Sequence, residues 1–342
     1  VYEEIETPPM TQNYVTSPDG SGFHTIETKS YRRQFAPKSY YAGFIDNDDV
    51  KWYLTDLGMV AGRFGFFDTL FATPVKGLEE FALQQTSEGE KVWFATPREA
   101  MTVNMPYRPD STVKVYNTNN SSIVDDSVIS IAMENEDLVW FGSKDGISGL
   151  YKDTWLNPSY DEIYPKVFFN YYPISSIATY HGGDSLLVAT RGGGIGRFYR
   201  NEVDGISGAS SYSKWGPCKL PSDNVQCMHV SGDTQWYGTD KGLAKHVGSD
   251  YWQNWTAYTT EDGLVNNFVQ TIAIDVSGKV WVGTRGGISV LDDSGWTNYT
   301  ISDGLLSNNI LNILCDKVGN VYLGSDKGFM IYQNGNLICF EE

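Results

Sequence analysis

Positive charge is scarce in this sequence of 342 residues, where 25 lysines and arginines stand against 42 aspartates and glutamates, giving a formal net charge of −17. Proteins that bind nucleic acid hold its phosphates with clustered cations, so this balance excludes a bulk electrostatic binder of that kind. Long apolar runs are also missing, and no segment approaches the roughly 18 uninterrupted apolar residues of a membrane span. We therefore expect neither nucleic-acid binding nor a transmembrane segment in this chain.

Recognisable catalytic patterns are absent as well. The four histidines, at positions 24, 181, 229 and 246, have neither metal-ligand nor triad spacing. The patterns HExxH and GxSxG and the phosphate-binding P-loop do not occur. The sequence therefore predicts no catalytic residue, no metal site and no cofactor. A pair of carboxyl groups brought together from distant positions would still allow glycoside cleavage, which keeps an enzyme as an alternative.

The four cysteines lack a regular spacing and so do not define a redox compartment. Cys315 and Cys339 fall on the inner and outer strands of one sheet in the pattern described below, about 14 Å apart and too far for a disulfide. Cys218 and Cys227 could pair across a connection between repeats. The first segment is polar and does not begin with Met, so we interpret the chain as a mature or trimmed product for which export is permitted.

What the sequence does contain is a repeat. An aromatic or aliphatic pair, a Gly or Ala, a Thr or Ser and a glycine turn recur together, most clearly in VWVGTRGG from Val280 and WYGTDKG from Trp236. Five further copies are WYLTDLG from Trp52, WFATPRE from Trp93, WFGSKDG from Trp140, LVATRGG from Leu187 and YLGSDKG from Tyr322. The successive intervals are 41, 47, 47, 49, 45 and 41 residues, which is the period of a four-stranded propeller blade.

Each repeat also carries the other strands of a blade. Alternating residues at 269–275 indicate an inner strand, and residues 288–291 and 296–300 indicate the third and outer strands. One blade cannot bury both faces of its sheet, so the blades must stack around an axis. The sequence predicts an all-β fold: a seven-bladed β-propeller with four antiparallel strands per blade at 40–342. The last copy has its own outer strand at 336–340, so ring closure by strand exchange is not evident.

Residues 1–39 lie outside the repeats. They contain a Pro/Ser/Gly portion at 17–22 and a strand-like piece at 24–28. We expect an N-terminal extension that packs on the propeller, either by adding to a sheet edge or by covering one end of the ring.

The unit at 262–288 resembles the two-component regulator propeller repeat, and a second close copy begins with DGLLSNN at Asp303. The resemblance covers residues 40–342 and implies a periplasmic sensor region of the kind found in hybrid two-component systems of gut Bacteroidetes, where propellers detect oligosaccharides. Those sensors usually continue into a second propeller, a small β-domain, a membrane span and a kinase. A free-standing exported propeller, lipid-anchored through an N-terminal cysteine lost from this sequence, fits at least as well as a sensor fragment does.

The ten tryptophans could indicate sugar binding, because aromatic faces stack on pyranose rings. Nine of them, however, fall at the second-strand or outer-strand positions of the repeat, so we expect these nine to pack between blades. Only Trp252 is off the pattern. The less periodic tyrosines Tyr171 and Tyr172 are better candidates for stacking on a ligand.

The turn after the second strand carries a cation in six of the seven copies. These turns and the blade-to-blade connections emerge at the same end of a propeller, so we expect a locally positive mouth there that favours an anionic or hydroxyl-rich ligand. Solvated turn residues chosen for hydrophilicity are the competing interpretation. The six cations are Arg98, Lys144, Arg191, Lys241, Arg285 and Lys327.

The leading interpretation is an exported, periplasmic or cell-surface propeller without enzymatic activity, which binds an oligosaccharide or another polar or anionic ligand in a sensing or uptake system, with a signalling or uptake protein as a further partner. One alternative is a propeller enzyme, a lyase or glycoside hydrolase with an acid/base pair in the channel. The architecture resembles streptogramin B lyase, whose catalytic His and acid match no position here. A second alternative is a protein-docking scaffold that uses the broad end face.

Overall fold

The protein divides into two compact units, residues 1–36 and 37–342. In the first, the computed structural model describes an antiparallel pair, β1 (Tyr14–Thr16) and β2 (Phe23–Thr25). The predicted packing of the N-terminal extension on the propeller stays a prediction. The described residues are 14–16, 23–25, 40–45, 51–55, 58–63, 66–69, 80–87, 89–104, 113–157, 172–180, 185–199, 208–213, 218–250 and 252–340.

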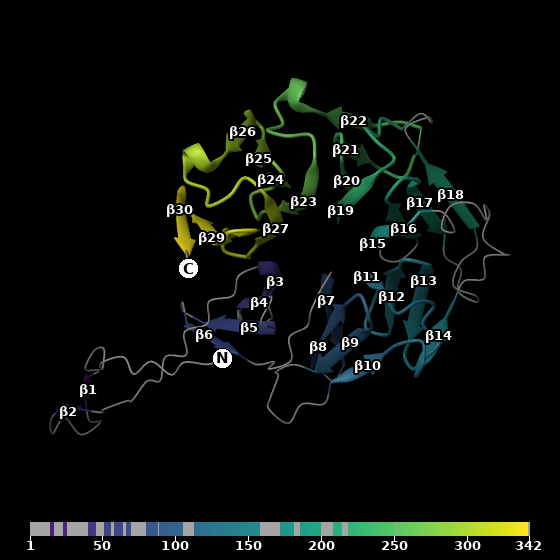
Figure 1. Ribbon diagram of the computed structural model, residues 1–342, viewed down its shortest axis with the longest axis horizontal. Helices are drawn as coiled ribbons and strands as arrows, with labels where there is room; N and C mark the ends of the chain where they lie inside the picture. Colours follow the sequence, from purple (N-terminus) through teal and green to yellow (C-terminus); the bar gives the residue numbers. More distant parts are fainter. Residues whose placement is uncertain are drawn as a thin grey trace. The chain divides into compact units, whose positions relative to one another are not determined.

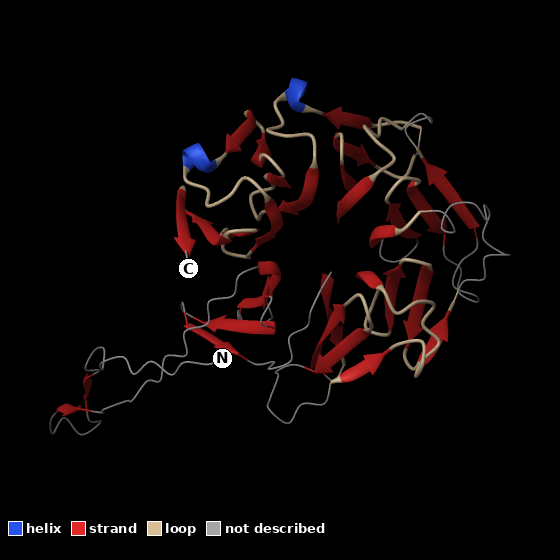
Figure 2. Ribbon diagram, viewed as in Figure 1, coloured by secondary structure: helices blue, strands red, loops and turns tan. Residues whose placement is uncertain are grey.

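The second unit contains seven four-stranded antiparallel sheets in its described residues, each formed by four strands consecutive in the chain (Figures 1 and 2). Blades 1 to 3 comprise β3 (Tyr40–Ile45), β4 (Lys51–Thr55), β5 (Gly58–Arg63) and β6 (Phe66–Thr69); β7 (Glu80–Thr86), β8 (Gly89–Ala95), β9 (Ala100–Asn104) and β10 (Lys114–Tyr116); and β11 (Val128–Met133), β12 (Leu138–Ser143), β13 (Gly146–Tyr151) and β14 (Thr154–Leu156).

Blades 4 to 7 continue the same order. They comprise β15 (Ile174–Tyr180), β16 (Ser185–Thr190), β17 (Gly194–Tyr199) and β18 (Gly208–Tyr212); β19 (Val225–Ser231), β20 (Thr234–Thr239), β21 (Gly242–Val247) and β22 (Trp255–Tyr258); β23 (Val269–Ile274), β24 (Val280–Thr284), β25 (Gly287–Asp292) and β26 (Gly295–Tyr299); and β27 (Ile310–Cys315), β28 (Val321–Ser325), β29 (Gly328–Gln333) and β30 (Asn336–Phe340).

The first strand of each sheet is the inner one. From β7 to β27, each inner strand contacts the inner strand of the next blade, and β27 contacts β3, which brings blade 7 beside blade 1. The predicted β-propeller is therefore confirmed. Blade 7 takes all four of its strands, β30 included, from one continuous segment, so blades 7 and 1 meet by packing and not by exchange of a strand.

A small residue on the second strand lets the following blade pack closely. A Cβ atom placed on Gly283 of β24 would lie 2.5 Å from Cγ2 of Thr271 in the same blade and 2.8 Å from Cγ2 of Ile310 in the next. Gly142 of β12 faces isoleucine methyl groups of β15 at 2.9 and 3.0 Å, and Gly238 of β20 faces a valine of β23 at 2.5 Å. The glycine of the repeat is thus required by contact between sheets.

A β-bulge near the start of the inner strand joins neighbouring blades. At each bulge one residue leaves the ladder, and its side chain is free to reach sideways. Ser175 in blade 4 donates its hydroxyl to the backbone oxygen of Val225 in blade 5 at 2.6 Å. Gln270 in blade 6 donates its amide to the backbone oxygen of Ile310 in blade 7 at 2.7 Å. These bonds tie the bulge of one blade to the first residue of the next blade's inner strand.

Short 3-10 turns explain the repeated DGL sequence in the last two blade connections. The turns Thr260–Asp262 and Ile301–Asp303 each have a threonine before them and an aspartate at the third position that form a reciprocal capping box. The glycine that follows, Gly263 or Gly304, has φ of 110° or 103°, a conformation that side chains with a Cβ rarely adopt. The motif is therefore a structural connector.

The prediction for the tryptophans is confirmed within the described residues. Five lie on second strands and three on outer strands, and the second-strand tryptophans of blades 2, 3, 5 and 6 are buried. Trp252 is 68% exposed, in agreement with its place off the pattern. Trp215 lies outside the described residues. The second-strand set is Trp52, Trp93, Trp140, Trp236 and Trp281, and the outer set is Trp155, Trp255 and Trp296.

Substituting Gly283 tests the packing requirement. Gly283→Val places methyl groups against Thr271 and Ile310 where no room exists, so we expect a loss of about 1–3 kcal/mol or more in the free energy of unfolding. Urea denaturation measures it. The control Thr297→Val, on the exposed outer strand β26, is expected to change stability by no more than about 0.5 kcal/mol. Equal stabilities of the two variants would contradict the requirement.

Candidate functional site

All six predicted cations lie in the turns between the second and third strands, and all six are exposed. A backbone bond ties each of several turns to the residue before its own inner strand. The N–H of Arg191 donates to the backbone oxygen of Pro173 at 2.9 Å, and that of Arg285 to Phe268 at 3.2 Å. The turns therefore adjoin the blade connections, as the propeller geometry requires.

Contact between neighbouring blades extends this end surface. Gly192 and Gly194, in and just after the turn of blade 4, donate N–H groups to the backbone oxygen of Asp223 at 3.0 and 2.8 Å. Arg191 also forms an isolated β-bridge with Asn224, immediately before β19 of blade 5. The turn of blade 4 is thus fixed against the start of blade 5, and their polar groups share one surface.

Tyr172 lies against the glycine turn of blade 4. Cβ atoms placed on Gly192 and Gly193 would each fall 2.7 Å from a carbon of the Tyr172 ring, so the ring covers both glycines. Tyr172 is 38% exposed and Arg191 is exposed. The structure therefore brings together two of the predicted ligand-binding residues, an aromatic ring and a guanidinium-bearing turn. Tyr171 lies outside the described residues.

Asparagine and glutamine side chains continue the polar surface on blade 5, where sequence reasoning missed them. The amide of Asn224 donates to the carboxylate of Asp240 at 3.1 Å, and Gln226 donates to the side-chain oxygen of Asn224 at 2.8 Å. Asn224 lies directly before the inner strand and Gln226 at its bulge, and such a bulge recurs in blades 1 and 3 to 7. That recurrence was the available signal.

A second polar group spans blades 6 and 7. The guanidinium of Arg285 lies 3.6 Å from the ring centroid of Phe268, and its Nε donates weakly to Gln270 at 3.5 Å. Gln270 in turn donates to Asn309 at 2.9 Å, and Asn309 donates to Asp326 at 3.3 Å. The cation predicted from the turn pattern is thus held by an aromatic ring that the pattern did not reveal.

Charge at this end is uneven between blades. In blades 5 and 7 an aspartate, Asp240 or Asp326, occupies the first turn position, and the lysine follows it. In blade 3, burial and the neighbouring carboxylate of Asp145 raise the pKa of Asp125, so two acidic side chains lie close together beside Lys144. In the described turns, Arg191 of blade 4 and Arg285 of blade 6 are the cations with no acidic residue within the same turn, because Glu99 follows Arg98 in blade 2.

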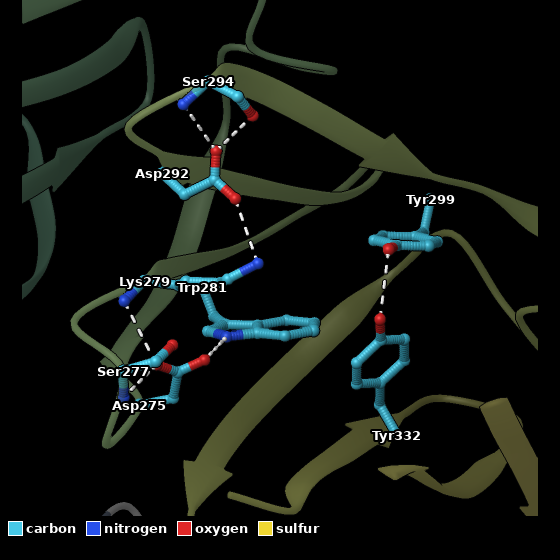
Figure 3. A network of polar contacts seen from close by, with 8 residues as sticks. All are labelled: Asp275, Ser277, Lys279, Trp281, Asp292, Ser294, Tyr299 and Tyr332. Atoms are coloured by element: carbon cyan, nitrogen blue, oxygen red, sulfur yellow. Dashed lines mark hydrogen bonds and ion pairs between the residues drawn. The ribbon is translucent and has the colours of Figure 1, made fainter. Parts of the chain in front are cut away.

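The opposite hairpins, between first and second strands, carry acidic residues with structural roles (Figure 3). The carboxylate of Asp275 accepts hydrogen bonds from Ser277, from the backbone of Lys279 and from the indole of Trp281. Burial opposes ionisation of Asp275, but these bonds outweigh it and lower the pKa. Asp316 likewise accepts from its turn and from Tyr322. Within the described part of the chain, no group of three His, Cys, Asp or Glu residues could hold a metal.

Glu80 carries the one carboxyl group with a strongly raised pKa in the described residues. Burial raises its pKa to about 7, although hydrogen bonds from Ser130 and the backbone of Ile131 lower it. Its Oε2 accepts the N–H of Ile131, on the inner strand of the next blade, at 2.8 Å. Glu80 therefore joins blades 2 and 3, and these contacts alone give it no catalytic partner.

None of the four cysteines forms a disulfide, so the bond considered between Cys218 and Cys227 does not form. The Cys218 thiol instead donates to the backbone oxygen of Ser213 at 2.6 Å. Burial raises the pKa of Cys227 to about 12, which keeps that thiol protonated and unreactive.

Four-stranded blades whose inner strands contact one another in succession, with hairpin turns and blade connections at one end, define the protein as a β-propeller. Residues 263–286, which extend from the DGL connector to the turn after β24, match the family model described as Two component regulator propeller. The resemblance inferred from the sequence is confirmed at this repeat, so the chain is a propeller that contains the two-component regulator propeller repeat.

Solved structures share the fold at low identity. The extracellular domain of a Bacteroides thetaiotaomicron protein described as a hybrid two-component system aligns with a TM-score of 0.65 and 16% identity, over 87% of this chain and 38% of that one. A second such domain from the same organism gives 0.50 and 17%, over 98% and 52%. This chain therefore spans only about half of these neighbours or less.

An enzyme has the same fold. Virginiamycin B lyase from Staphylococcus aureus aligns with a TM-score of 0.60 and 14% identity, over 84% of this chain and 92% of the lyase. No curated protein matches the chain. In the regions that the structure describes, no helix has the length and apolar character needed to cross a membrane.

The raised pKa of Glu80 predicts a pH dependence of stability. A carboxyl group whose pKa rises from 4.5 to about 7 on folding binds its proton more tightly in the folded state. The stability it contributes is present below about pH 4.5 and is lost as the pH rises toward 7. Glu80→Gln should remove this decline in the free energy of unfolding, measured by urea denaturation at pH 4.5, 6 and 7.5. The exposed control Glu261→Gln should retain it, and an unchanged slope in Glu80→Gln would contradict the assignment.

Proposed function

We propose that the protein is an extracytoplasmic ligand-binding propeller of a sensing or uptake system. It recognises an oligosaccharide or another polar or anionic ligand at the end where the turns between second and third strands lie. The observation that supports this best is the group in blade 4, where the ring of Tyr172 covers the glycine turn beside the exposed Arg191.

The chemistry of this group suits a sugar ligand. An exposed aromatic ring supplies an apolar face for a pyranose ring, while the guanidinium supplies paired donors for a carboxylate or for hydroxyl groups. The neighbouring Asn224 and Gln226 add amide groups at the same end. Blade 6 offers a second combination of the same kind in Phe268, Arg285 and Gln270.

The location outside the cytoplasm is supported by the neighbours of similar fold, which are extracellular domains. The repeat family itself is named for two-component regulation. A signalling or uptake protein is the partner that this proposal implies, with the propeller supplying recognition. Glu80, the carboxyl group in the described residues whose pKa is raised to about 7, binds a backbone N–H of the next blade, which favours the binding function over a propeller enzyme.

Binding measurements on two variants test the site. Wild type, Tyr172→Ala and Arg191→Gln are titrated with neutral cello-oligosaccharides and with acidic oligogalacturonides by isothermal calorimetry. Loss of the stacking ring should weaken both sugar classes about tenfold, whereas loss of the guanidinium should weaken the acidic class more than the neutral one.

The matched control is Lys317→Gln, which removes an exposed cation from the hairpin between β27 and β28, at the other end of the blades. It should leave binding unchanged. Sugar binding that survives in both Tyr172→Ala and Arg191→Gln would overturn the placement of the site, and no binding of either class by the wild type would overturn the proposed ligand.

A further inference from the structure

Blade 4 departs from the other blades at its interface with blade 5. In blades 2, 3 and 6 the second-strand tryptophan donates its indole N–H to an acidic or amide side chain at the end of the inner strand, at 2.8 to 2.9 Å. Blade 7 has Tyr322 and Asp316 in the same relation. Blade 4 has Leu187 in place of the aromatic residue, and Tyr180 stands where the acid would be.

An arginine lies beside the smaller leucine. Arg197 of β17 pairs directly with Leu187 of β16. Its guanidinium carbon lies 4.9 Å from the ring centroid of Tyr180 and 5.1 Å from that of Tyr199. Arg197 is only 8% exposed, so this positive charge lies within the interface between blades.

Both hydrogen-bond acceptors of this buried cation that the structure describes are neutral, although Asp233 acts electrostatically on the same Tyr180 ring. Its Nε donates to the Ser185 hydroxyl at 3.1 Å, and its Nη1 donates to the backbone oxygen of Ser249 in blade 5 at 3.2 Å. Among the described residues no carboxylate forms an ion pair with it. The nearby Asp250 directs its two oxygens to Trp252 and Gln253 of its own loop, at 3.0 and 2.9 Å.

A buried charge without a counter-ion is costly, and the guanidinium retains hydrogen-bonding capacity to spare. It has five N–H donors in a planar fork, of which the two bonds above use two. The remaining donors, including both on Nη2, have no acceptor among the described residues. Across the interface His246 is 3% exposed, and its Nδ1 is buried without a hydrogen-bond partner.

We propose that Arg197 forms a binding site for an oxyanion carried by a ligand, either a carboxylate or a sulfate ester. The site lies between blades 4 and 5, at the end opposite the turns between second and third strands. The anion supplies an ion-pair partner that no described residue provides, and it accepts hydrogen bonds from the donors of the fork that the described residues leave unused. The rings of Tyr180 and Tyr199 hold the guanidinium in place for it. This site is separate from the group around Tyr172, so a test of either site does not decide the other.

Anion titrations of the full chain test the proposal. Wild type, Arg197→Lys and Arg197→Met are titrated at constant ionic strength with sodium glucuronate and, in a separate arm, with sodium sulfate, against sodium chloride. Tryptophan fluorescence reports binding, because Trp255 stacks on His246 at this interface. We expect saturable binding to wild type, weakened about tenfold in Arg197→Lys, which keeps the charge but loses the fork, and abolished in Arg197→Met.

Tighter binding of glucuronate than of sulfate would identify a sugar carboxylate as the ligand group, and the reverse would identify a sulfate ester. Thermal unfolding supplies an independent measurement. Without an anion, Arg197→Met should unfold at the same temperature as wild type or a higher one, because it removes an unpaired buried charge. Non-saturable titration of the wild type, equal binding by Arg197→Met, or a large drop in its unfolding temperature would each overturn the proposal. Tyr172→Ala should leave the anion titration unchanged.

Discussion

The close approach of each inner strand to the second strand of the preceding blade is the constraint on which the fold depends. Gly142, Gly238 and Gly283 leave no room for a Cβ atom because methyl groups of neighbouring inner strands occupy that space. The bulge side chains Ser175 and Gln270 then bind carbonyl groups of the next blade. A single blade has neither set of contacts, so the sheets are stable together and not one by one.

The same packing decides where function can reside. Buried aromatic residues and the hydrogen bonds of the acidic hairpins hold the blades together, which leaves the turns free to vary. At the turn end, the exposed Tyr172 lies near Arg191 and the half-buried Phe268 lies under the exposed Arg285, so each blade combines a ring and a cation on a rigid frame. The packing differs between blades 4 and 5, because Arg197 occupies an interface where blades 2, 3, 5 and 6 have a buried indole.

The fold could be predicted because its signals are periodic: a glycine, a threonine or serine and an aromatic residue recur at the blade spacing. The site could be predicted only in part. The turn cations were identified from their position, but Phe268, Asn224 and Gln270 act through contacts between segments that no local pattern reveals. Arg197 was missed because its surroundings differ from those in other blades: Leu187 replaces the aromatic residue of the second strand, and Tyr180 replaces the acidic or amide side chain. These replacements can be recognised only when the strands are paired.

Hydrogen exchange followed by mass spectrometry tests most directly whether contacts between blades hold the structure together. If these contacts stabilise the whole ring, amides of the inner strands β11, β15, β19, β23 and β27 share one free energy of opening, equal to that of global unfolding. Gly283→Val should then lower protection in all of these strands together. Loss of protection confined to blades 6 and 7, with the other inner strands unaffected, would show that the blades are stable separately.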